Sequence, residues 1–167
     1  MNREPGPVPS SETPSASPPA RFGLMLLSLV YLLALAELTL TPHGGRGVMP
    51  VNLTPGRMIT IFWEIGGVRA LVNLWGNLVV FLPVGWIWPS LVRGTRWSSW
   101  WGTLAVGLVL SAIIEVSQWG LGTRVADIDD VLLNTAGAGL GHVSRALVLK
   151  LVARWSRNDS AGSDSPQ

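Results

Sequence analysis

Four long apolar runs, separated by shorter polar segments, occupy most of this chain of 167 residues. A helix needs roughly 20 residues to cross the hydrocarbon core of a bilayer, which is about 30 Å thick. Each run reaches or approaches that length, so we predict an all-α, polytopic membrane protein with four transmembrane helices. The predicted spans are residues 22–40, 70–92, 98–121 and 128–153.

The two ends of the chain differ from the runs in composition. Residues 1–20 and 156–167 are rich in Ser, Pro and other polar or small residues and hold very few large apolar ones. Such segments cannot bury enough apolar surface to offset the entropy lost on ordering. We therefore predict a disordered N-terminal tail, one membrane domain at residues 21–155, and a disordered C-terminal tail.

The first run has an alternative interpretation as a signal peptide. Arg21 precedes the apolar residues, and Ala34-Leu35-Ala36 matches an A-x-A cleavage site. The run continues with apolar residues beyond Ala36, however, and the tail before it is long and weakly basic. We therefore favour an uncleaved first helix.

A long polar segment, residues 41–69, separates the first and second runs. The apolar residues at 58–63 are too few to cross a bilayer. We predict a short interfacial or re-entrant helix after the N-L-T-P sequence at 52–55. Because it precedes the second run, this helix belongs on the same side of the membrane as the loop between the third and fourth runs.

Composition agrees with lipid as the surrounding solvent. Charged residues make up 13% of the chain, whereas a soluble domain is about one quarter charged. The absence of cysteine excludes disulfides and thiol chemistry. Eight of the twelve Arg and Lys residues fall on the side that carries both termini, which predicts cytoplasmic termini. The net charge of +2 is thereby explained by orientation, and we predict no nucleic-acid partner.

Polar side chains interrupt three of the runs at helical spacing. Residues three or four positions apart lie on the same face of a helix, so each set forms one stripe. The stripes consist of Asn73 and Asn77 in the second run, Ser111, Glu115, Gln118 and Gly122 in the third, and Asp127, Asp130, Asn134, Gly137, Gly141 and Ser144 in the fourth.

Depth predicts that these stripes meet. With a rise of 1.5 Å per residue, Asn77, Glu115 and Asn134 each lie roughly 6 to 11 Å inside the outer end of their helix. We therefore predict one outward-facing polar pocket between three helices. A carboxylate within a membrane usually faces a partner or a water-filled cavity. Arg124 is the predicted counter-charge, and Glu37 either joins the pocket or is solvated at the interface.

A structural role for the same residues is the alternative. The amides and Glu115 would then be interhelical hydrogen-bonding groups. The G-x-x-x-G step of Gly137 and Gly141 has a structural interpretation in any case, because it allows a second helix backbone to approach closely.

The sequence D-x-D-D at 127–130 suggests a divalent cation, because hard cations prefer carboxylate oxygens. It lacks the glycine and alternating ligands of a calcium loop, so we predict no metal, with Asp127, Asp129 and Asp130 as weak candidates only. Asp127 or Asp129 alternatively caps the fourth helix. His43 and His142 have no second histidine at ligand spacing, and we interpret both as incidental.

No G-x-S-x-G, Walker or zinc motif occurs, and we predict no cofactor. Catalysis would then depend on a carboxylate acting as an acid or base. The candidates are Glu115 and Asp130.

Two motifs together resemble the VanZ-like family of bacterial membrane proteins. They are NLWGNLVVFLPVGWIWP at 73–89 and IEVSQWGLGTRVADIDDVLLNTAGAGLG at 114–141. The resemblance covers about residues 25–145, with Gly56 standing where the family pattern leads us to expect phenylalanine. The family motif falls on Asn73, Asn77, Pro83, Gly85, Glu115, Gln118, Arg124, Asp127, Asp130, Asn134 and Gly137.

The resemblance implies a multi-span protein of the bacterial cytoplasmic membrane, in a family named for a member associated with teicoplanin resistance. Our leading hypothesis is that the pocket binds a lipid-linked or phosphate-bearing cell-wall precursor and alters glycopeptide susceptibility. The alternatives are an enzyme that modifies an envelope lipid and a subunit of an oligomeric transporter. The predicted ligand-binding residues are Asn73, Asn77, Glu115, Gln118, Arg124, Asp127, Asp130 and Asn134.

Overall fold

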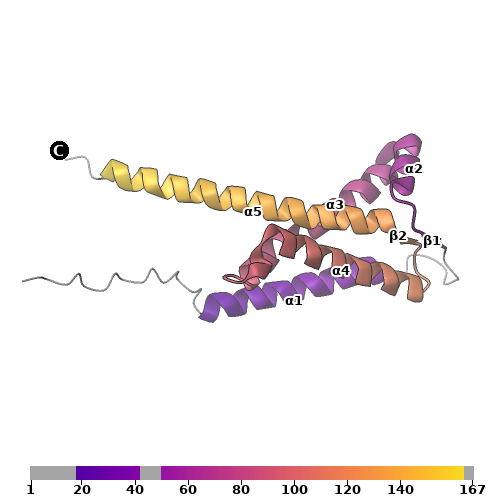
Figure 1. The fold of residues 1–167 in the computed structure, drawn as a ribbon, viewed down its shortest axis with the longest axis horizontal. Helices are drawn as coiled ribbons and strands as arrows, with labels where there is room; N and C mark the ends of the chain where they lie inside the picture. Colours follow the sequence, from indigo (N-terminus) through magenta and orange to yellow (C-terminus); the bar gives the residue numbers. More distant parts are fainter. Residues whose placement is uncertain (1–17, 42–49, 164–167) are drawn as a thin grey trace, which may run out of the picture.

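A computed structural model describes residues 18–41 and 50–163 (Figure 1). The long helices run roughly along one axis, and the short elements α2, β1 and β2 gather at one end (Figure 1). In chain order the elements are α1 (Pro18–Leu40), β1 (Val51–Asn52), α2 (Arg57–Ile65), α3 (Gly67–Leu91), the 3₁₀ turn η1 (Arg96–Ser98), α4 (Trp100–Gly120), β2 (Ala126–Asp127) and α5 (Ile128–Ser163).

Three helices are long and apolar enough to cross a membrane, judged by length and composition: Arg21–Leu40, Leu71–Leu91 and Trp100–Gly120. They coincide with the first three predicted spans. The fourth predicted span lies in α5, which is not among the three because polar residues and glycines dilute its apolar character. This helix continues to Ser163, although residues 156–167 were predicted to be a disordered tail.

Helices α3 and α5 approach each other backbone to backbone. A Cβ atom added at Gly137 would collide with the carbonyl oxygen of Leu78, and one added at Gly141 would collide with that of Leu82. From the other side, a Cβ at Gly85 would strike the α5 backbone. The structural interpretation of the G-x-x-x-G step is therefore confirmed, because only glycine allows this separation.

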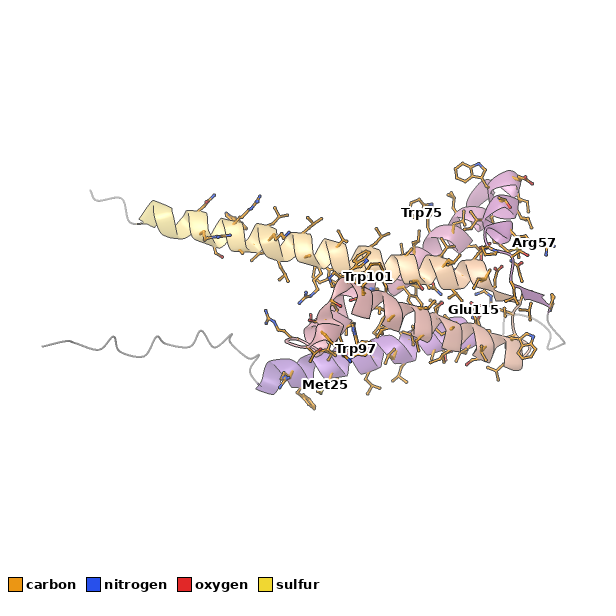
Figure 2. The ribbon with its side chains drawn as sticks, viewed as in Figure 1. Met25, Arg57, Trp75, Trp97, Trp101 and Glu115 are labelled. Atoms are coloured by element: carbon orange, nitrogen blue, oxygen red, sulfur yellow. The ribbon has the colours of Figure 1, made fainter. Side chains whose placement is uncertain are left out.

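Helix α1 contacts the other helices along one narrow stripe. Leu35 is buried among Phe81, Ile114 and neighbouring residues of the core. The Tyr31 hydroxyl donates a hydrogen bond to the carbonyl oxygen of Val80 at 2.8 Å. Much of the remaining α1 surface is exposed apolar side chain, including Met25, which is labelled in Figure 2. An apolar exterior of this kind suits contact with lipid rather than water.

Candidate functional site

A two-stranded parallel pair joins two loops that are far apart in sequence. Strand β1 pairs with β2, with Asn52 opposite Asp127. The side chain of Asn52 donates to Asp127 Oδ1 at 2.9 Å, and the Asn52 side-chain oxygen accepts from the Thr54 N–H at 3.2 Å. The segment before α2 is thereby fixed to the start of α5.

Asp127 connects three elements through its backbone and side chain. Its Oδ1 also accepts from the Asp129 N–H at 2.9 Å, which is the bond expected of a residue that caps α5. Its own N–H donates to Glu115 Oε2 on α4 at 2.8 Å. Glu115 and Asp127 are each 6% exposed. A buried carboxylate requires a hydrogen-bond partner, and the Asp127 N–H is the partner of Glu115.

Asp129 caps a different helix, α2. Its side chain is 1% exposed and accepts from the Gly56 N–H, from the Met58 N–H at 2.8 Å and from the Ile59 N–H at 3.3 Å. These groups lie in the first turn of α2, where backbone donors lack intrahelical partners and the helix dipole favours a negative charge. Asp129 thus holds α2 against the start of α5.

Gly56 fits this arrangement although it departs from the family pattern. Its φ of +81° lies in the left-handed region, which glycine adopts without steric cost. The segment before α2 is therefore docked through the backbone N–H of Gly56.

The stripes on α3, α4 and α5 meet in pairs. Asn77 donates to Asp130 Oδ1, and Asn134 donates to Ser111 Oγ at 2.8 Å. Asn134 is 4% exposed, and its Oδ1 is a buried atom without a hydrogen-bond partner in the described structure. Asn73 lines a narrow crevice beside Asp130, between α2, α3 and α5. These pairings show that spacing placed the stripes on the correct helix faces.

Two predicted site residues lie at the edge of this cluster. Gln118 donates to the carbonyl oxygen of Thr39 at 2.7 Å, which ties α4 to the end of α1. Arg124 is exposed in the loop before β2. It forms no ion pair within residues 18–41 and 50–163, and acts on Glu115 and Asp130 by electrostatic attraction over a longer distance. Glu37 is also exposed.

A cavity of about 330 Å³ adjoins the cluster between β1, α4 and the start of α5. Most of its lining is apolar, including Val51, Trp119 and Val131. Glu115 and Asp127 are its charged lining residues, and Figure 2 places Glu115 toward the end that carries β1 and β2. The accessible wall of the cavity is therefore apolar, and the two carboxylates are buried in it with hydrogen bonds to the protein.

Asp127, Asp129, Asp130 and His142 each have a hydrogen-bond partner within the protein. In the described part of the chain, no group of three or more His, Asp or Glu residues is placed to hold a metal ion. His142 Nδ1 lies 2.8 Å from Thr103 Oγ1, and its ring meets Trp100 edge-on, with centroids 5.7 Å apart. His43 lies outside the described residues.

Asn52 and the α2-capping role of Asp129 were not predicted. Asn52 belongs to the N-L-T-P sequence, from which we predicted only the start of a short helix. Asp129 is not among the residues of the α5 stripe. The available signal was that N-L-T-P and D-x-D-D lie on the same predicted side of the membrane.

A sequence model described as VanZ/LLP1 matches residues 27–149. The chain belongs to the VanZ/LLP1 family. No curated protein and no solved structure matches it. Family membership and the three membrane-length helices together make this a VanZ-like membrane protein.

Proposed function

We propose that this VanZ-like protein crosses the cytoplasmic membrane four times and exposes its polar end outward. Helix α5 packs antiparallel to α4 along the middle of α4. A membrane that surrounds α4 therefore also surrounds α5. The facing pairs are Thr103 with His142, Gly107 with Ala138, and Ser111 with Asn134. The distribution of Arg and Lys supports cytoplasmic termini.

We further propose that the polar end engages a lipid-linked cell-wall precursor. The observation that carries this proposal is the apolar cavity of about 330 Å³ beside the exposed Arg124. Part of the lipid chain would lie on the apolar wall. Arg124 is exposed two residues before the cavity-lining Ala126, and its guanidinium supplies the donors that bind phosphate oxygens. Glu115 and Asp127 would hold the wall of the cavity in place through their hydrogen bonds to the protein.

Binding to the purified protein in nanodiscs tests this function. A fluorescent lipid-linked cell-wall precursor should bind, and Arg124→Gln should weaken its affinity by at least about tenfold, because a charge-assisted contact is lost. Arg57→Gln is the matched control, since Arg57 is an exposed arginine at the same end of the molecule (Figure 2). Equal weakening by both substitutions, or no binding by the parent protein, would contradict the proposal.

Cells provide a second test. If precursor binding alters glycopeptide susceptibility, Arg124→Gln should remove any teicoplanin protection that the parent protein confers, at unchanged protein abundance. Protection that persists in this variant would separate the phenotype from the site.

An enzyme acting on the same lipid is the second candidate, because a buried carboxylate, Glu115, lines the cavity. Its general acid–base chemistry would require a titratable group within hydrogen-bonding reach of the substrate. Glu115→Gln retains an oxygen that can accept from the Asp127 N–H, so the substitution preserves the fold contact and removes the acid. Conversion of the labelled precursor that is lost in this variant would favour the enzyme. Binding without conversion would favour the binding protein.

A further inference from the structure

A second cavity lies away from the polar cluster, between α1, α3 and α4. It has a volume of about 490 Å³. Apolar side chains form most of its lining, among them Leu32, Ile87, Leu91 and Val109. Figure 2 places Trp97, another lining residue, toward the end opposite α2. Nothing in the proposed function uses this cavity.

The polar side chains in its wall are largely satisfied by the protein. Ser28 donates to the Leu24 carbonyl oxygen at 2.7 Å, and Tyr31 donates to that of Val80 at 2.8 Å. The Trp88 indole donates to the Trp97 carbonyl oxygen at 3.0 Å. Because these donors are already engaged, the portion of an occupant inside the cavity is apolar.

The apolar lining of the cavity and its extent along α4 suit a hydrocarbon chain. The cavity follows α4 from Ala105 to Ile113, about 12 Å at 1.5 Å per residue. The long direction of the cavity follows the helices, which is also the direction of acyl chains in the surrounding leaflet.

Three arginines flank the end of the cavity marked by Leu91 and Trp97. Arg93 and Arg96 are exposed in the connecting turn, and Arg96 lies over the Trp97 ring at 5.9 Å. Arg145 donates to Ser90 Oγ at 3.1 Å and is close enough to Arg93 for mutual repulsion. None of the three forms an ion pair within the described ranges, and residues 65–114 and 131–158 contain no acid.

We propose that this cavity is a binding site for an anionic phospholipid, with one acyl chain in the cavity and the phosphate against Arg93 and Arg96. Basic residues between spans at the cytoplasmic face favour anionic headgroups, and a phosphate would relieve the repulsion between Arg93 and Arg145. The inference depends on membrane residence and is independent of the ligand proposed for the polar end.

Lipid retention measured by native mass spectrometry tests this site. The full chain is purified from nanodiscs that contain equal amounts of phosphatidylglycerol and phosphatidylcholine with identical acyl chains. The protein should retain phosphatidylglycerol preferentially. Arg93→Gln with Arg96→Gln should reduce that preference at least about tenfold. The matched control is Arg154→Gln with Arg157→Gln, which removes the same charge from exposed positions of α5 and should leave the preference unchanged.

A second pair of variants tests the hydrocarbon part. Val109→Trp fills the cavity and should reduce retention of both lipids, whereas Leu108→Trp, on an exposed α4 position outside the lining, should not. Glycerol phosphate, added as a competitor, tests whether the site binds phosphate without an acyl chain. Displacement of phosphatidylglycerol by millimolar glycerol phosphate would overturn the proposal. Equal retention of the two lipids by the parent protein, or equal effects of the two double arginine variants, would also overturn it.

Discussion

Asp129 links helix α2 to the start of α5 through its carboxylate. Its carboxylate accepts hydrogen bonds from three backbone N–H groups at the start of α2, and a hydrogen bond to a charged group contributes about 1.5–3 kcal/mol. Asp129→Asn removes the charge and brings an amide N–H₂ toward these donors. We expect a loss of at least about 1.5 kcal/mol from the docking of α2, measured as faster hydrogen exchange across residues 57–65.

Glu64→Gln provides the control for this substitution, because Glu64 is an exposed acid of α2. It removes the same charge without removing a contact with α5. Unchanged exchange in Asp129→Asn would contradict the capping role. Faster exchange in α3 and α4 as well would indicate that the whole domain, and not α2 alone, depends on this carboxylate.

Residue pairs that follow from helical spacing could be predicted, and those that depend on loop geometry could not. Asn77 with Asp130 and Ser111 with Asn134 lie on stripes of adjacent helices, so depth and periodicity brought them together. Asn52 and Asp127 are 75 residues apart and meet through paired strands of two residues. Strands this short leave no alternating pattern, because the period-two signal requires about four or more residues.

The contact between α3 and α5 depends on the absence of side chains. Gly137→Ala would force its Cβ into the Leu78 carbonyl, and overpacking of this kind costs about 1–3 kcal/mol. We expect lower stability in thermal or denaturant unfolding in detergent. Gly76→Ala is the control. Gly76 is on α3, like Leu78, and a Cβ at Gly76 would meet nothing within 4 Å. That substitution should be neutral or stabilising, since Ala favours helix over Gly.

Equal destabilisation by the two glycine substitutions would mean that helix propensity, rather than close approach, determines the effect. The glycine step itself was predictable from the sequence, because G-x-x-x-G marks a face for close packing. Its partner could not be predicted, since Leu78 and Leu82 contribute carbonyl oxygens, which every residue possesses.

At the scale of the whole molecule, α5 determines the number of membrane crossings. The three spans evident from composition would leave the two ends of the chain on opposite sides. Helix α5 has 36 residues, about 54 Å at 1.5 Å per residue, so it exceeds the thickness of the hydrocarbon core. Its polar and small residues weaken the hydropathy signal, but they face α3 and α4, where hydrogen bonds and close packing replace apolar contact with lipid.

Paired topology reporters should therefore give opposite results on the two sides of α5. A reporter inserted at Arg124 should be external, because this loop precedes α5 at the end that carries α2. A reporter fused to the C-terminus should be cytoplasmic, where arginine and lysine of the second half of α5 are favoured. Alkaline phosphatase, active outside, and green fluorescent protein, fluorescent inside, distinguish these outcomes. If both reporters were on the same side, α5 would not cross the membrane. The hydrogen bonds of α5 with Ser111 and Thr103 of α4 would then have to break in the membrane.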